Sequence, residues 1–259
     1  MRFETADVSL LGDREDNQDR ATVQSAEGRL LLVVADGMGG HAGGALAAEV
    51  AVDSLCRSLV ARPPTAADCR EFLGEAMATA HDAVVATGEK MGLGSRPRAT
   101  CAACLVCEDH AIWAHVGDSR VYLVRNGAIV TRTRDHTPIE SLLQDGLISE
   151  EEVAGHPMRH YVEYCLGGAA EQPLVALSAV ESLQVGDLVV VCSDGLWSGV
   201  SDTDLAAGPD PDVALQDWLA RLAGRAVRAG TPYSDNTTAV ALRVLADCTT
   251  PAGESLETE

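Results

Sequence analysis

Apolar residues along this chain recur in blocks, and the blocks are of two kinds. The first is a short run rich in valine, leucine and alanine that ends at glycine, asparagine or aspartate, a pattern typical of buried or half-buried strands. Such runs predict strands at residues 21–24, 30–35, 99–107, 111–116, 120–125, 128–131, 175–180, 188–192 and 237–244. The dipeptide Asn126-Gly127 between two of them predicts a tight hairpin.

The second kind of block is longer and has the helical period. It predicts helices over residues 43–61, 65–91 and 212–229, and Arg62-Pro63-Pro64 separates the first two. Strands and helices do not alternate steadily, as they do in a parallel βαβ sheet. We therefore expect an α+β fold, a four-layer α-β-β-α sandwich of two antiparallel sheets flanked by helix pairs.

The chain shows no low-complexity linker and no internal repeat, so residues 1–245 are interpreted as one domain. Within it, residues 135–168 are acidic, poorly apolar and interrupted by proline and glycine. This segment is longer than a hairpin connection needs, and we call it the flap. A substrate loop and a solvated surface excursion are both open interpretations of it. Residues 246–259 are acidic without a cation and predict a disordered tail.

Composition narrows the possible functions. Apolar residues make up 46% of the 259, which is enough for a sizeable core and excludes disorder of the whole chain. Acidic residues number 39 against 19 basic ones, a net charge of −20, which argues against binding nucleic acid or anionic membranes through a basic surface. The start of the chain carries Glu4 and Asp7 where a signal peptide needs an apolar run. We expect a cytoplasmic monomer without a membrane span.

Three cysteines, Cys101, Cys104 and Cys107, have a spacing that could suggest an iron–sulfur site. On a strand, however, a spacing of three residues places Cys104 on the face opposite the other two. The surrounding residues are apolar, and free cysteine packs like a small hydrophobic residue. We therefore interpret these thiols as buried residues of a strand.

Four aspartates stand next to apolar strands and beside small or polar residues. Asp36 and Asp194 each end a strand and precede glycine, Asp118 lies in a turn between strands, and Asp235 comes just before the last strand. Any one of them is typical of a turn. Several carboxylates in a partly dry cleft repel one another unless a cation neutralises them, and carboxylate oxygens suit Mg²⁺ or Mn²⁺. A glycine after the aspartate lets the backbone approach an ion closely.

These aspartates fall within five motifs that occur in a fixed order. The motifs are Gly12-Asp13-Arg14-Glu15-Asp16-Asn17-Gln18-Asp19, Val34-Ala35-Asp36-Gly37-Met38-Gly39-Gly40-His41, Val116-Gly117-Asp118-Ser119-Arg120, Cys192-Ser193-Asp194-Gly195-Leu196 and Ser234-Asp235-Asn236. Together they resemble the type 2C metal-dependent (PPM) serine/threonine protein phosphatases in their bacterial form. The resemblance covers about residues 3–244. One departure is Arg98-Ala99, where the family usually has Met-Gly before the threonine.

The resemblance implies ligands for two core ions, Mg²⁺ or Mn²⁺, and for a weaker third. Asp36 would bridge the two core ions, and Asp194 and Asp235 would complete one of them. The Gly37 carbonyl would bind the other ion, and Asp19 would act through a water. Asp118 would hold the third ion together with Asp194, and Asn236 would support the site.

The same resemblance implies hydrolysis of phosphoserine and phosphothreonine in proteins, with a metal-bridging water as nucleophile. Its partners would be phosphorylated proteins, the substrates of a cognate Ser/Thr kinase. Arg14 would bind the phosphate, because a planar guanidinium donates two parallel hydrogen bonds; the alternative is a surface ion pair with Glu15 or Asp16. His41 is a candidate general acid, or a residue that caps or orients its loop. His136, His156 and His160 are interpreted as flap or surface residues.

Two other classes of function remain open from the residues. Gly37-Met38-Gly39-Gly40-His41-Ala42 fits the G-x-G-x-x-A pattern of a nucleotide-binding module, although Asp36 would repel a pyrophosphate there. The chain could also be a phosphatase-like scaffold that binds phosphoproteins without hydrolysing them. The intact Asp36, Asp194 and Asp235 argue against that scaffold.

Overall fold

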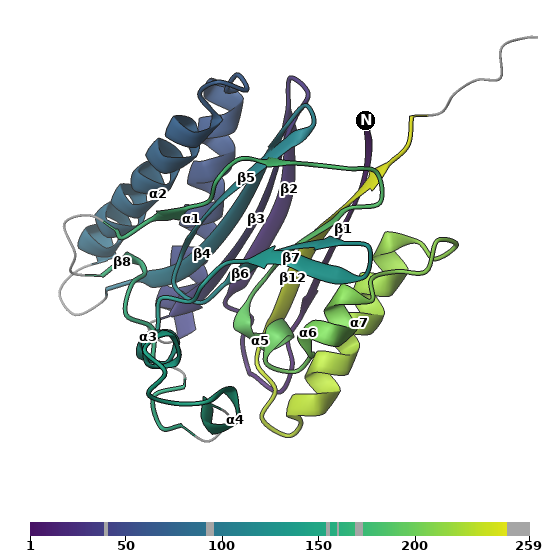
Figure 1. The fold of residues 1–259 in the computed structure, drawn as a ribbon. Coiled ribbons are helices and arrows are strands. Elements are labelled where there is room, and N and C mark those ends of the chain that lie inside the picture. Colours follow the sequence, from purple (N-terminus) through teal and green to yellow (C-terminus); the bar gives the residue numbers. More distant parts are fainter. Residues whose placement is uncertain (39–40, 92–95, 154–155, 160, 169–172, 248–259) are drawn as a thin grey trace, which may run out of the picture.

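The computed structural model describes residues 1–38, 41–91, 96–153, 156–159, 161–168 and 173–247. Two antiparallel sheets face each other between two groups of helices (Figure 1). The predicted four-layer sandwich is therefore confirmed. Most of the predicted tail, residues 248–259, lies outside the described residues.

The first sheet has the strand order β1 (Arg2–Leu10), β12 (Thr237–Leu245), β11 (Leu188–Cys192), β6 (Arg120–Arg125) and β7 (Ala128–Arg132). The second has the order β10 (Glu181–Ser182), β5 (His110–Val116), β4 (Arg98–Cys107), β3 (Arg29–Met38) and β2 (Asp19–Ala26). Two short strands extend the second sheet: β8 (Leu166–Gly167) pairs with β4, and β9 (Ala176–Leu177) pairs with β5.

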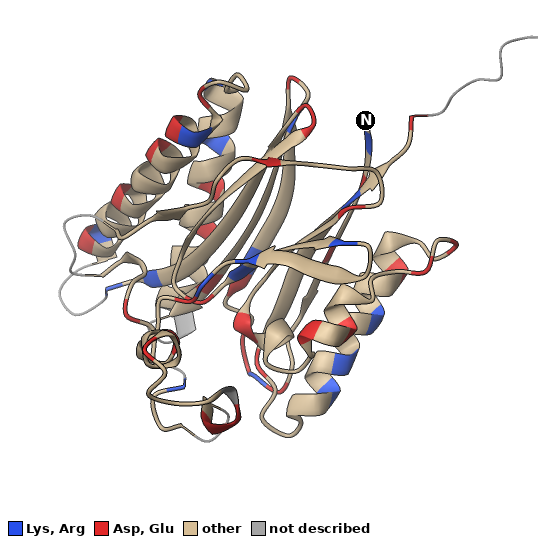
Figure 2. Ribbon diagram, in the orientation of Figure 1, with Lys and Arg blue, Asp and Glu red and all other residues tan. Residues whose placement is uncertain are grey.

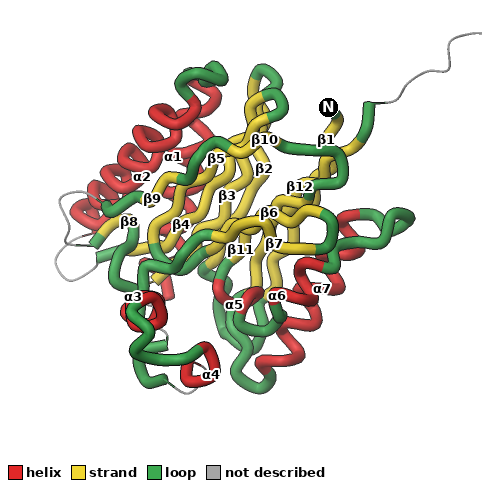
Figure 3. Tube along the Cα trace, in the orientation of Figure 1, coloured by secondary structure: helices red, strands yellow, loops and turns green. Residues whose placement is uncertain are grey.

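The helices cover the outer faces of the sheets (Figure 3). The second sheet is covered by α1 (His41–Ala61) and α2 (Cys69–Met91). The first is covered by α5 (Asp194–Trp197), α6 (Asp202–Ala206) and α7 (Leu215–Gly230). The flap contains α3 (Pro138–Gln144) and α4 (Glu150–Val153), which lie below the sandwich in Figure 1. No helix in the described ranges has the length and apolar character needed to cross a membrane.

Strand alternation explains why the sandwich has three apolar layers. Along β3, Leu31, Val33 and Ala35 pack against α1 and α2, whereas Leu32 and Val34 pack between the two sheets. A third cluster fills the space between the first sheet and α7. Successive strand residues point to opposite faces, so a strand buried on both faces is apolar throughout.

The same alternation determines on which face of the sheet each cysteine of β4 lies. Cys101 and Cys107 lie in the layer under α1 and α2, and Cys104 lies between the sheets. The predicted opposite placement of Cys104 is confirmed, and it separates this thiol from the other two. The structure also joins Cys69 and Cys107 in a disulfide, a pairing that the sequence did not predict.

Strands β1 and β9 and helix α2 are among the elements that differ from the sequence prediction. Strand β1 was not predicted, and it pairs along its whole length with β12. The run 175–180 forms only the two-residue β9, because the Trp113 N–H donates to the Ser178 hydroxyl instead of a strand carbonyl. Helix α2 begins at Cys69, since the carboxylate of Asp68 accepts hydrogen bonds from the backbone and hydroxyl of Thr65 and so closes a turn.

The connection from β3 through α1 and α2 leads to β4, which runs antiparallel to β3. A dinucleotide-binding fingerprint requires a parallel βαβ unit around its glycine turn. The nucleotide-binding alternative is therefore wrong for this segment.

Gly37 allows α1 to lie against the end of β3. A side chain at this position would collide with the backbone carbonyl of Gly44 and would come 2.9 Å from the carbonyl oxygen of Gln18. We predict that Gly37→Ala lowers the free energy of unfolding by about 1–3 kcal/mol, because neither neighbour is a flexible side chain. Urea denaturation measures the change.

Gly74→Ala is the matched control for that prediction. Its added Cβ would be in ordinary contact with Leu177 at 3.4 Å inside α2. There alanine should raise stability by up to about 1 kcal/mol through its higher helix propensity. Equal effects of the two substitutions would show that the close approach at Gly37 does not matter.

Candidate metal centre

A cleft of about 840 Å³ opens at one end of the sandwich. Its lining residues come from the loop before β2, the end of β3, the β5–β6 turn, α5, the end of α7, the flap and the segment before β12. Acidic segments gather there between the two sheets, beside α5 (Figure 2). The cleft therefore joins parts of the chain that are far apart in sequence.

Asp36, Asp118 and Asp194 line this cleft from three different elements, and Asp19 is buried beside Asp36. Asp19 opens β2 and is the direct cross-strand partner of Asp36 near the end of β3. Asp118 lies in the turn between β5 and β6, and Asp194 begins α5 directly after β11. Two like charges directly opposite each other on neighbouring strands destabilise a sheet. A bound cation that neutralises both carboxylates would remove this repulsion.

Burial and nearby like charges raise the pKa values of these four carboxylates. Burial, followed by the charge of Asp19, raises the pKa of Asp36 well above its usual range, and burial with the charge of Asp118 does the same to Asp194. Burial raises the pKa of Asp19 to about 6, although its carboxylate accepts a hydrogen bond from the Ser193 hydroxyl at 2.7 Å. The pKa of Asp118 rises to about 6 through burial and the charge of Asp135.

These residues fit a hard divalent cation. The donors are all carboxylate oxygens, the ligand type that Mg²⁺ and Mn²⁺ prefer. Asp19 Oδ1 is buried without a hydrogen-bond partner in the described part of the chain, so a free acceptor lies on the residue that faces Asp36 across the strands. No three His, Cys, Asp or Glu side chains of that part are already close enough together to enclose an ion. Mg²⁺ suits such an open arrangement because it keeps several of its waters.

The loop before β2 is tied to the segment before β12 by a set of hydrogen bonds. Asn236 accepts from the Gln18 N–H at 2.8 Å and donates to the carbonyls of Leu11 and Asp16 at 2.9 and 3.0 Å. The Asp13 carboxylate accepts from the backbone and hydroxyl of Ser234. Asn236 thus joins two segments that lie more than 200 residues apart.

Arg14 lies in this loop and lines the cleft. Its Nη2 donates to Asp235 Oδ2 at 2.7 Å, and the arginine side chain is 57% exposed. The sequence left open a surface ion pair of Arg14 with Glu15 or Asp16. In the structure, Arg14 forms its ion pair with Asp235. Arg14 and Asp235 stand together at the cleft, where both a phosphate and a cation could reach them.

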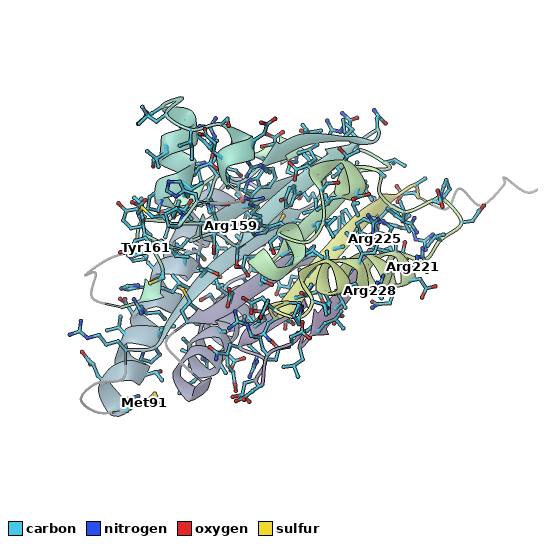
Figure 4. All side chains as sticks on the ribbon, turned by 90° about the horizontal axis from the view of Figure 1, so that it is seen from below. Met91, Arg159, Tyr161, Arg221, Arg225 and Arg228 are labelled. Carbon is cyan, nitrogen blue, oxygen red and sulfur yellow. A yellow bond between two sulfur atoms is a disulfide. The ribbon has the colours of Figure 1, made fainter. Side chains whose placement is uncertain are left out.

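The second arginine of the cleft comes from the flap, and the sequence did not indicate it. Among the described lining residues, Arg14 and Arg159 are the ones with positive charge. Figure 4 shows Arg159 beside Tyr161, apart from Arg221, Arg225 and Arg228, which lie along α7. No local pattern could have identified it, because it lies in a loop without periodicity.

The histidines have different places. His136 lies in the flap, and its Nδ1 accepts a hydrogen bond from the Gly117 N–H at 3.3 Å, beside Asp118. His41 begins α1, but its side chain lies outside what the structure describes, as does His160. The general-acid and loop-orienting roles of His41 both stay predictions.

Comparison with known proteins defines the class. Residues 9–230 match the protein phosphatase 2C family, which covers most of the chain. The chain therefore belongs to the protein phosphatase 2C family, as the five motifs predicted.

Particular relatives agree with this assignment. The chain is 33% identical to a putative protein phosphatase 2C-type protein of Streptococcus pyogenes, over 79% of this chain and 82% of that one. It is 34% identical to the serine/threonine protein phosphatase PstP of Mycobacterium tuberculosis, covering 84% of this chain but 41% of PstP. A solved catalytic domain of PstP, in complex with two manganese ions, superposes with a TM-score of 0.77 at 32% identity and covers 94% of this chain and 99% of that domain.

The raised pKa values predict how pH acts on stability in the absence of metal. Asp19 and Asp118 have an ordinary value of 3.8 and a folded value of about 6, so the folded state binds protons more readily. Their contribution to stability is therefore complete below pH 3.8 and is lost as the pH rises through about 6. In EDTA, the melting temperature should fall between pH 5 and pH 7.5, and saturating Mn²⁺ should reduce that fall.

Asp118→Asn is the control for this measurement, because it removes one titrating group and should make the fall in EDTA shallower. Parallel pH profiles in EDTA and in Mn²⁺ would contradict the prediction. They would mean that a bound cation does not relieve the repulsion among these carboxylates.

Proposed function

We propose that this chain hydrolyses phosphoserine and phosphothreonine in proteins, with divalent cations bound at the aspartate cleft, and that it reverses a Ser/Thr kinase. The observation that carries the proposal is the gathering of Asp36, Asp118, Asp194 and Asp235 in the lining of one cleft, together with Arg14 and Arg159. Named relatives support the substrate class: PstP is a serine/threonine protein phosphatase.

Two core ions, Mg²⁺ or Mn²⁺, have their ligands in this cleft. Asp36 would hold both ions, Asp194 and Asp235 would complete one of them, and the Gly37 carbonyl would bind the other, with Asp19 in support. Divalent ions of this kind offset the charge of a phosphate and lower the pKa of an attacking water. The two manganese ions in the PstP catalytic domain support this assignment.

A third, weaker cation has its ligands in Asp118 and Asp194. Both residues line the cleft, and the charge of Asp118 is the largest electrostatic influence on the pKa of Asp194 after burial. An ion with few protein ligands keeps mostly waters and binds weakly.

Arg14 binds the substrate phosphate. A guanidinium offers two parallel donors to phosphate oxygens, and Arg14 is 57% exposed at the cleft with a carboxylate as its present partner. Asn236 and Asp13 hold its loop in place through the hydrogen bonds described above. The flap contributes Arg159 and thereby influences which phosphoproteins are accepted.

Asp36→Asn tests the catalytic proposal. Replacing the shared carboxylate with a neutral amide should lower turnover of a phosphothreonine peptide and of p-nitrophenyl phosphate by about 100-fold or more, since a cation site provides several kcal/mol. Both substrates should be hydrolysed by the wild type with Mn²⁺ and not in EDTA. Asp53→Asn, on the exposed face of α1, is the matched control. Turnover of the Asp36 variant within tenfold of wild type at saturating Mn²⁺ would exclude the role, and an inactive wild type would favour the scaffold alternative.

The two arginines of the cleft should respond differently to substitution. Arg14→Ala should raise the KM for a phosphopeptide by about 10- to 100-fold through loss of a charge-assisted contact. Arg159→Ala should raise the KM for phosphoproteins more than for p-nitrophenyl phosphate, because a small substrate does not reach the flap. Arg62→Ala is the control, an ion-paired surface arginine of similar exposure at 53%. Unfolding of the Arg14 variant as its main defect would make Arg14 a structural ion-pair residue.

A further inference from the structure

The turn that carries Asp118 is held by the indole of Trp197. This tryptophan is the last residue of α5, the short helix that begins with Asp194. Its Nε1–H donates to the backbone carbonyl of Asp118 at 2.9 Å. One hydrogen bond therefore connects the segment of Asp118 to the segment of Asp194, although the two residues are 76 positions apart (194 − 118).

The indole is itself fixed by Arg120. The guanidinium carbon lies 3.7 Å from the centroid of the Trp197 ring, within cation–π distance. Asp135 binds the same guanidinium in a bidentate pair, with distances of 2.8 and 2.7 Å, and the Tyr122 hydroxyl accepts from Arg120 Nη1 at 3.0 Å. The side chains of Arg120 and Asp135 are only 13% and 6% exposed, so this stack has little freedom to move.

The opposite side of the turn is held by the base of the flap. Gly117 has a positive φ of 95°, and its N–H donates to His136 Nδ1 while its carbonyl accepts from the His136 N–H at 2.9 Å. Asp118 is thus fixed through its own carbonyl and through the preceding residue. Asp118 itself lines the cleft.

We propose that Trp197 and Arg120 are positioning residues that set the separation of Asp118 from Asp194 and thereby the affinity for the weak third cation. The inference rests on the proposed function, which assigns that cation to these two carboxylates. An ion with two protein ligands depends strongly on their spacing, because it has no other protein group to compensate for a displaced one. Neither positioning residue is among the residues that line the cleft.

Trp197→Phe isolates the hydrogen bond, since phenylalanine keeps a ring beneath Arg120 and removes the N–H. Calorimetric titration with Mn²⁺ should show the Kd of the weak binding phase raised by about three- to tenfold, with the tight phase unchanged. The Mn²⁺ concentration that half-saturates turnover of p-nitrophenyl phosphate should rise by the same factor. Trp218→Phe, at a buried tryptophan of α7, should leave both titrations at their wild-type values.

Arg120→Lys is the second variant, and it decides the question if the first does not fold. Lysine keeps the positive charge beside Asp135 but loses the bidentate pair and the flat contact with the indole. It should weaken the same binding phase. A purely structural role predicts a lower melting temperature with both binding phases unchanged, and that result would overturn the proposal.

Asp118→Asn distinguishes a failure of the positioning role from a failure of the third-cation assignment. Loss of the weak phase in this variant, with wild-type binding in the Trp197 and Arg120 variants, would overturn the positioning role alone. Retention of the weak phase in Asp118→Asn would overturn the third-cation assignment and the positioning role with it. Weakening of the same phase in all three variants supports both.

Discussion

Four carboxylates, those of Asp19, Asp36, Asp118 and Asp194, lie in or beside one cleft, and burial together with nearby like charges raises the pKa of each. Nothing in the four side chains favours this arrangement, so the rest of the fold has to hold them there. Each one follows or precedes a strand or turn whose residues are packed in the apolar layers of the sandwich. The rigid double sheet is therefore the condition for the site, because loops alone would let the carboxylates separate.

Both sheets use the same local arrangement to bring a carboxylate to the cleft. In each, Asp-Gly lies at or just after the end of a buried strand, and a helix begins there or shortly after. A side chain on Gly37 would collide with the backbone of Gly44, and one on Gly195 would collide with the backbone of Asn236. The missing side chain thus lets a second segment lie directly against the strand end. For Gly195, that second segment carries Asp235, so the same close packing brings Asp235 to the strand end.

The elements that could be predicted from sequence are those whose local pattern and tertiary environment agree. The strand at residues 30–35 is apolar throughout because it is buried on both faces, and Asn126 and Gly127 both take the positive φ values that their hairpin requires. Strand β1 was missed because polar residues alternate along it at the edge of its sheet. The five ordered motifs identified the aspartates of the site. The contacts of Arg14 with Asp235 and of Trp197 with Asp118 connect residues far apart in the chain, and no local pattern encodes them.

Asp235 differs from the other four carboxylates because it is paired with Arg14. Its side chain is 36% exposed and accepts a 2.7 Å hydrogen bond from Arg14, so its charge already has a partner. In the proposed function, a cation takes Asp235 as a ligand and a phosphate becomes the anionic partner of Arg14. The arginine then exchanges one anion for another within the same cleft, and neither charge is left without a partner. Such an exchange requires that the loop of Arg14 stay close to Asp235, and the three hydrogen bonds of the neighbouring Asn236 keep it there.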